Sequence, residues 1–462
     1  MRRLTPLALL LAFALVAAAC GDDDATTTEA TVAATTATTV AGAATTAATE
    51  TTEAPPETMA PLLTDIGVTD DTIKVGLLSD LSGLFAPLVQ IITDANIAFW
   101  DKVNADGGIA GGRMVELVVT DTSYDVPTHV QLYEELKAEV AAIGQSTGSP
   151  HTAAIADSLA EDGLFAIPLS WYSGWPHNAN VLELGGSYCF ESMNVVSWMD
   201  TMSEPGWTLA VMSFPGEYGQ DSAFGAKYAA DQLGVEVVYD GEGAIIPGGD
   251  NSGVIAEMAA TSPDWVWVTS NSGHLAEIVG GSVAAGLDAQ WSASLPSYNP
   301  SLLLGDLAGT FDSSFYWPTF FAAWGADVPG MADLQETIIA AYGDAPAVLA
   351  DFYVRGWTEA QMMKQILEAA YANNDMTQAG ILAAAQSAES FDFQGLAENQ
   401  SFAGTPEENA VRSVSIYDIQ LAEFNPAGLS SGGSTGAVLA EDFFVSDIAA
   451  NYDFSGGACF AG

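Results

Sequence analysis

One short motif in the chain has the spacing of a serine hydrolase. Gly144, Ser146 and Gly148 form a G-x-S-x-G pattern between a predicted strand and a predicted helix, which is the setting of a nucleophile elbow. A catalytic triad also needs a histidine base. None of the 4 histidines lies in the last stretch of the sequence, where that fold delivers its base. We therefore keep catalysis by Ser146 as an alternative hypothesis.

The same segment can instead bind a ligand without reacting with it. The predicted strand ends in Gln145, Ser146 and Thr147, and the predicted helix begins near Ser149. The first N–H groups of a helix have no partner within the helix, and the helix dipole places positive charge there. Hydroxyl groups add further donors, although Ser and Thr also serve as helix caps. The segment is thus predicted to bind the acceptor end of a small ligand, such as a carboxylate.

Metal and nucleotide sites lack their usual sequence patterns. The chain contains no H-E-x-x-H, no paired C-x-x-C, no EF-hand loop and no G-x-x-x-x-G-K-[ST]. We expect no metal and no cofactor.

The chain is strongly acidic, with a formal net charge of −49 at pH 7. Such a charge repels nucleic acid and anionic membrane surfaces. A hydrophobic fraction of 49% exceeds that of disordered chains. We expect a folded body whose acidic surface favours solubility, with a role in concentrating cations as the alternative.

The first 20 residues have the pattern of an export signal. Arg2 and Arg3 precede an apolar run that ends in Ala-Ala-Ala-Cys20. Small residues before a cysteine resemble the lipobox of bacterial lipoproteins, which implies lipidation of Cys20. A retained membrane anchor is the alternative, but the run is shorter than the roughly 20 residues that span a membrane. Residues 21–70 are predicted to form a flexible Thr/Ala-rich linker.

Only two further cysteines occur, Cys189 and Cys459. In an oxidising compartment they can form one disulfide or remain two separate buried thiols. The sequence leaves both possibilities open.

Two α/β series follow one another in the body of the chain. Short β-rich runs alternate with helical patterns, which is the rhythm of parallel strands wrapped by helices. Strands are predicted at 73–80, 115–121, 140–143, 164–168, 208–214, 235–238, 265–270, 290–294 and, as a late strand, 411–421. Helices are predicted at 127–137, from 150, at 220–233, before 261, from 274, at 331–342 and at 347–372. The fold class is α/β.

Several strings together resemble the type I periplasmic binding proteins of the branched-chain amino acid (Leu/Ile/Val) class. These strings are IKVGLLSDLSG, VNADGGIAGGRMVELVVTD, AAIGQSTGSPHTAAIADSLAEDGLFAIPLS, EYGQDSAFGAKYAADQLGVEVV and DWVWVTSNSGHLAEIVGGSVAAGLDAQW. The likeness spans residues 72–421.

The resemblance implies two Rossmann-like doubly wound lobes joined by a three-strand hinge. Lobe 1 would comprise 71–195 and 316–410, and lobe 2 would comprise 196–315 and 411–462. Such a protein closes on a small organic ligand and delivers it to the permease and ATPase of an ABC importer. It is not an enzyme, and we expect a monomer, lipid-anchored in the periplasm or at the cell surface. A ligand-sensing domain of the same fold is the alternative.

The resemblance also implies a set of ligand-binding residues in the loops that follow the strands. These are Gln145, Ser146, Thr147, Ser149, Ser170, Trp171, Tyr218 and, after a lobe 2 strand, Asn271 or Ser272. Aromatic residues beside these loops, Phe85 and Tyr172, are predicted to add an apolar wall to the cleft, and Tyr298 of the matching lobe 2 stretch completes the candidate set.

One departure from the family pattern concerns the ligand. Members that bind α-amino acids place a carboxylate after a lobe 2 strand to hold the ammonium, but the matching stretch WSASLPSYN has no acid. An unpaired buried ammonium is costly. Either Glu217 or Asp221 substitutes, or the ligand is not an ordinary amino acid. We favour the second, with an amide or aromatic acid among the candidates.

Overall fold

The computed structural model describes residues 61–461 of the chain. The predicted signal peptide, its Cys20 and the linker up to residue 60 lie outside the described residues. Within 61–461, no helix is long and apolar enough to cross a membrane.

The first sheet has four parallel strands in the order β3-β2-β4-β5. Its strands are β2 (Thr72–Ser79), β3 (Met114–Asp121), β4 (Ala142–Thr147) and β5 (Ala166–Leu169). The connecting helices are α1 (Ala86–Ala105), α2 (Val126–Leu136) and α3 (Ser149–Asp162). Strand β4 is buried along its whole length, as expected for a central strand covered on both faces. The order places the carboxyl ends of all four strands at one edge.

The second sheet has seven strands in the order β13-β12-β10-β9-β8-β6-β7. Its parallel part comprises β6 (Thr208–Ser213), β7 (Glu236–Gly241), β8 (Trp265–Thr269), β9 (Gln290–Ala293) and β10 (Phe315–Thr319). The helices between these strands are α5 (Gly216–Leu233), α6 (Ser252–Ala260), α7 (Ser272–Ala284) and α8 (Ala308–Ser314). An antiparallel hairpin, β12 (Val414–Asn425) and β13 (Ser434–Phe444), extends one edge.

The chain crosses between the lobes three times. It leaves lobe 1 after β5 and enters α4 (Tyr188–Met202), which packs against α5. After β10 it returns to lobe 1, and before β12 it crosses again. The first and third crossing segments lie side by side, since Gly186 bridges to Val411.

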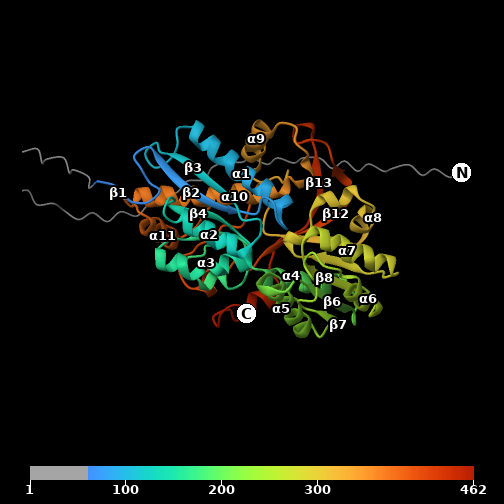
Figure 1. The fold of residues 1–462 in the computed structure, drawn as a ribbon. Coiled ribbons are helices and arrows are strands. Elements are labelled where there is room, and N and C mark those ends of the chain that lie inside the picture. Colours follow the sequence, from blue (N-terminus) through green and yellow to red (C-terminus); the bar gives the residue numbers. More distant parts are fainter. Residues whose placement is uncertain (1–60, 462) are drawn as a thin grey trace, which may run out of the picture. The chain divides into compact units, whose positions relative to one another are not determined.

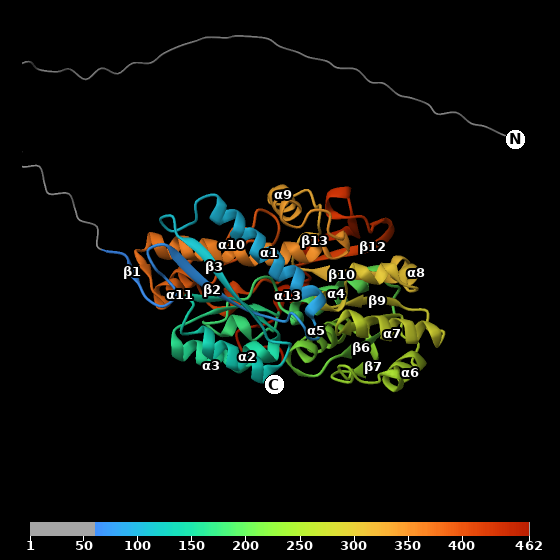
Figure 2. The same ribbon diagram turned by 45° about the horizontal axis from the view of Figure 1, so that its top comes forward.

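The returning segment completes lobe 1. It contributes α9 (Met331–Tyr342), α10 (Asp351–Ala372), α11 (Gln378–Ser387) and the short α12 (Pro406–Asn409). In Figures 1 and 2, α10 lies beside α1 although the two helices are far apart in the sequence. The last helix, α13 (Asp447–Asn451), contacts α4. Single turns of 3-10 helix occur at Trp175–His177, Leu295–Ser297, Pro300–Leu304, Ala347–Leu349 and Leu429–Ser431.

Two predicted lobe boundaries and the end of the linker differ from the structure. The boundary at 195/196 falls inside α4, and the boundary at 315/316 falls inside β10, a strand of the second sheet. Helix α4 is buried on nearly all sides, so its sequence shows no break at the crossing. The folded body also begins before residue 71, because β1 (Leu63–Thr64) pairs with β11 (Asp375–Met376).

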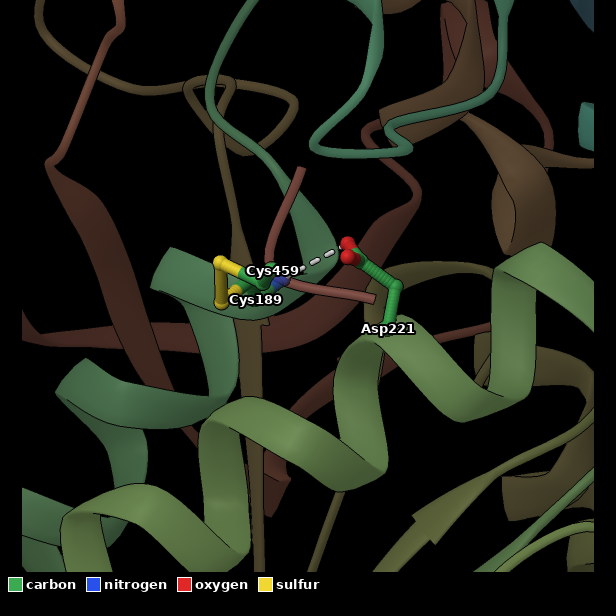
Figure 3. Close-up of side chains that lie close together, drawn as sticks. All are labelled: Cys189, Asp221 and Cys459. Carbon is green, nitrogen blue, oxygen red and sulfur yellow. Dashed lines mark hydrogen bonds between the residues drawn. A yellow bond between two sulfur atoms is a disulfide. The ribbon is translucent and has the colours of Figure 1, made fainter. Parts of the chain in front are cut away.

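Cys189 and Cys459 form a disulfide that ties the last residues of the chain to the start of α4. Asp221 of α5 points toward this disulfide and accepts a hydrogen bond from the Cys189 amide at 3.2 Å (Figure 3). It also accepts one from the Ser173 amide at 3.1 Å. These three side chains, Cys189, Asp221 and Cys459, are near enough to share a metal ion, but the disulfide removes both thiolates that such an ion would need.

Candidate ligand-binding site

A cavity of about 50 Å³ lies between the two lobes. Most of its wall comes from the carboxyl ends of the parallel strands and the segments that follow them, where ligands of open α/β sheets bind, and α10 contributes Phe352 and Arg355. The lining residues are Phe85, Leu88, Val89, Ile92, Tyr124, Thr147, Gly148, Ser149, Leu169, Trp171, Tyr188, Tyr218, Leu295, Pro296, Phe352 and Arg355.

The loop after β2 places an aromatic ring in the wall. Asp80 holds the loop, because its carboxylate accepts hydrogen bonds from the amides of Gly83 at 2.6 Å and Phe85 at 2.7 Å. A Cβ at Gly83 would lie 2.4 Å from the Ser123 carbonyl oxygen, so this close approach requires glycine. The Phe85 ring lies 6.3 Å from the ring of Tyr218 in lobe 2. The two lobes therefore meet across the cavity.

The start of α3 presents unused hydrogen-bond donors. Gly148 precedes the helix with a φ of +98°. Its amide donates a hydrogen bond to the carbonyl oxygen of Leu169, the last residue of β5, at 3.2 Å. No side chain caps the helix. Ser149 is 1% exposed, and its buried hydroxyl has no hydrogen-bond partner. Because a buried polar group without a partner is costly, this hydroxyl is a candidate ligand contact.

Arg355 of α10 brings a buried cation to the cavity. Its Nη2 donates to Pro168 O at 3.0 Å and lies 3.0 Å from Glu359 Oε1. Burial lowers the pKa of the Arg355 guanidinium, and burial raises the pKa of Glu359 to about 7 although the arginine opposes that rise. Sequence reasoning missed this residue. The available signal was an arginine inside the otherwise apolar run FYVRGW.

Lobe 2 contributes an uncharged wall. The Tyr218 hydroxyl donates to Ser270 O at 2.7 Å, and burial raises its pKa above the ordinary value. The Tyr188 ring lies 4.5 Å from that of Tyr218. The backbone at Leu295 is fixed by Glu191, whose Oε1 accepts the Leu295 amide at 2.8 Å.

No aspartate or glutamate lines the cavity within the described part of the chain. Asp221 is occupied by Ser173 and Cys189 near the disulfide, and Glu217 is not among the lining residues. Neither substitutes as a partner for a ligand ammonium in the observed geometry.

Five of the twelve predicted ligand-binding residues line the cavity. They are Phe85, Thr147, Ser149, Trp171 and Tyr218. The other seven do not: Gln145, Ser146, Ser170, Tyr172, Asn271, Ser272 and Tyr298.

The structure gives most of these seven another role. Gln145 Nε2 donates to Ser79 Oγ at 2.8 Å, and Ser170 Oγ accepts from Trp175 at 3.1 Å. Tyr172 bonds the carbonyl of Phe460 near the chain end, and Asn271 caps α7 next to Ser272. Tyr298 is fully buried, with its ring 4.8 Å from Phe315. These residues lie at or just after the ends of strands, but their side chains do not line the cavity.

The serine hydrolase alternative is not supported by the geometry of Ser146. Its Oγ lies 3.1 Å from His129 Nε2 and 2.8 Å from Thr152 Oγ1. Ser146 and His129 are both fully buried, and His129 Nδ1 has no partner, so no acid orients the ring. Burial, with a smaller effect of His151, lowers the pKa of His129 to about 3. Neither Ser146 nor His129 lines the cavity.

Two lobes that enclose a cavity at the ends of their parallel strands define a two-lobed solute-binding protein. The chain belongs to the periplasmic binding protein family, whose sequence model matches residues 72–423. The resemblance to the type I class is thereby confirmed.

Solved structures agree with this assignment. A fatty acid ABC transporter substrate-binding protein from Thermomonospora curvata is 30% identical, with a TM-score of 0.76 over 85% of this chain and 97% of that one. A branched chain amino acid ABC transporter protein from Thermus thermophilus with bound valine is 19% identical, with a TM-score of 0.69 over 83% and 98%. LivJ from Streptococcus pneumoniae, in complex with isoleucine, is 17% identical, with a TM-score of 0.63 over 80% and 100%. A search of curated proteins found no match.

Proposed function

We propose that this protein captures a small organic acid with an apolar body, of the fatty acid type, and delivers it to the permease and ATPase of an ABC importer. The relative from Thermomonospora curvata supports this proposal, since it is named a fatty acid transporter protein and is 30% identical over most of the chain. Family members act outside the cytoplasm. Lipid anchoring through Cys20 and action as a monomer complete the proposal.

The observation that carries the proposal is the hydrocarbon lining of the cavity. Leu88, Val89 and Ile92 of α1 face it from lobe 1, while Leu295 and Pro296 face it from lobe 2. Each buried CH₂ group of a ligand gains about 0.8 kcal/mol in such surroundings. An α-ammonium would have no carboxylate to pair with, and an unpaired buried charge is strongly unfavourable. An apolar acid therefore fits better than an amino acid.

Binding requires the lobes to move. The cavity volume of about 50 Å³ is smaller than the roughly 150 Å³ of an engineered cavity that holds benzene. A ligand therefore enters when the hinge opens, and it favours closure because it contacts both lobes. In this proposal the protein binds its ligand and releases it chemically unchanged.

A thermal-shift and calorimetry screen tests the proposal. The probes are butanoate, octanoate and dodecanoate, compared with leucine and isoleucine, on the mature chain. Binding to the native state raises the melting temperature by mass action. We expect a rise with at least one fatty acid and a smaller one with either amino acid. A rise only with the amino acids would contradict the proposal.

A further inference from the structure

We propose that Arg355 is the residue that recognises the carboxylate of the ligand and so restricts the cavity to anions. This inference rests on the proposed function and deepens it, because it names the chemical group that the cavity selects. Arg355 lines the cavity, two of its donor nitrogens have no partner, and neighbouring aromatic rings hold its side chain.

Arg355 differs from the other cations of the described chain. All eight lysines and arginines in residues 61–461 lie within 4.0 Å of an acid: Lys74, Lys102, Arg113, Lys137, Lys227, Arg355, Lys364 and Arg412. Of these, Arg355 alone lines the cavity. In its pair with Glu359 both side chains are almost completely buried. Because this cation is buried, it does not contribute to the solubility of the protein, and its presence calls for another explanation.

Two donor nitrogens of Arg355 are left without a partner. Pro168 O and Glu359 both meet Nη2, whereas Nε and Nη1 are buried and unpaired. The second carboxylate oxygen of Glu359, Oε2, accepts from Asn96 Nδ2 at 3.1 Å. A charged donor that is buried without an acceptor costs more free energy than a neutral one. A carboxylate oxygen of a ligand would supply the missing acceptor.

The surroundings hold the guanidinium in place. Its Cζ lies 5.3 Å from the centre of the Trp171 ring and 5.3 Å from that of the Phe321 ring. Trp171 is itself fixed, because its Nε1 donates to Leu184 O at 2.8 Å. Little rotamer freedom remains to be lost when the ligand binds, so the site is preorganised.

A second acid that interacts with Arg355, Glu183, does not cancel this preference. Glu183 is fully buried near Arg355, and burial raises its pKa well above the ordinary value although the arginine opposes that rise. Burial thus disfavours the charged form of the Glu183 carboxyl group. The unpaired Ser149 hydroxyl lines the same cavity and provides an additional donor for the ligand.

Calorimetry with octanoate and octanamide tests the inference. These probes share one chain, but only the first carries a charge. The variants are Arg355→Lys and the double change Arg355→Met with Glu359→Gln, which avoids leaving a buried charge unpaired. Arg113→Met is the matched control, since Arg113 is also buried but does not line the cavity. Circular dichroism and melting curves establish that each variant is folded.

The expected result is a loss of octanoate affinity of about 10-fold to 100-fold in the double variant, with octanamide affinity changed less than 3-fold. Arg355→Lys should retain part of the preference, and the control should keep the wild-type ratio. If a folded Arg355 variant kept the wild-type ratio of octanoate affinity to octanamide affinity, the inference would be overturned. The proposed function, fatty acid binding, would still stand. Failure of the wild-type chain to bind octanoate would overturn the proposed function itself, and this inference with it.

Discussion

Replacing Ser149 by alanine should strengthen the ligand-free fold and weaken ligand binding at the same time. The Ser149 hydroxyl is buried without a hydrogen-bond partner. Ser149 is not the helix cap, because Gly148 occupies that position. An unsatisfied buried polar group costs about 1–3 kcal/mol. We therefore expect the Ser149→Ala free energy of unfolding to rise by about 1 kcal/mol. Loss of a hydrogen bond to a charged ligand oxygen, about 1.5–3 kcal/mol, should lower octanoate affinity at least 10-fold.

Urea unfolding of the ligand-free protein and calorimetry with octanoate measure the two effects. Ser282 of α7 offers a matched control, because its hydroxyl is also buried and unpaired but lies outside the cavity. Ser282→Ala should show a similar gain in stability with unchanged affinity. The reasoning would be refuted if Ser149→Ala lowered the free energy of unfolding and bound octanoate as tightly as the wild type.

Two further predictions concern the buried acid and the disulfide beside the cavity. Burial raises the pKa of Glu191 from 4.5 to about 8, so the folded state holds this proton more tightly than the unfolded state. The free energy of unfolding should therefore fall as the pH rises between these two values, by at most about 5 kcal/mol. Glu191→Gln should flatten this pH dependence in urea unfolding measured from pH 5 to pH 8, and an unchanged slope would count against the buried-acid explanation. Removing the disulfide with Cys189→Ala and Cys459→Ala should lower the free energy of unfolding by about 2–5 kcal/mol; denaturation curves that coincide with those of the wild type would contradict this.

The sequence predicts the elements well because their signals are local. The run IKVGLLSD predicts a strand at 73–80, and β2 occupies Thr72–Ser79. The run WVWVTS predicts 265–270, and β8 occupies Trp265–Thr269. The pairing of β1 with β11 joins residues that are more than 300 positions apart in the sequence, and no local pattern reveals it. The predicted linker, 21–70, therefore overlaps the start of the folded body at β1.

The site is only partly predictable for a related reason. A strand end shows which loop faces the ligand, but neighbouring side chains in that loop point in different directions. Trp171 lines the cavity while Tyr172 bonds Phe460, and Thr147 lines it while Ser146 bonds His129. Arg355 comes from a helix far along the chain. Only the packing of α10 against α1 within lobe 1 brings it to the cavity.

The most direct test of the account compares octanoate with 2-aminooctanoate by calorimetry at one pH. The two ligands differ by a single α-ammonium, for which the lining offers no carboxylate. We expect octanoate to bind at least 10-fold more tightly than 2-aminooctanoate. Equal or tighter binding of 2-aminooctanoate would contradict it.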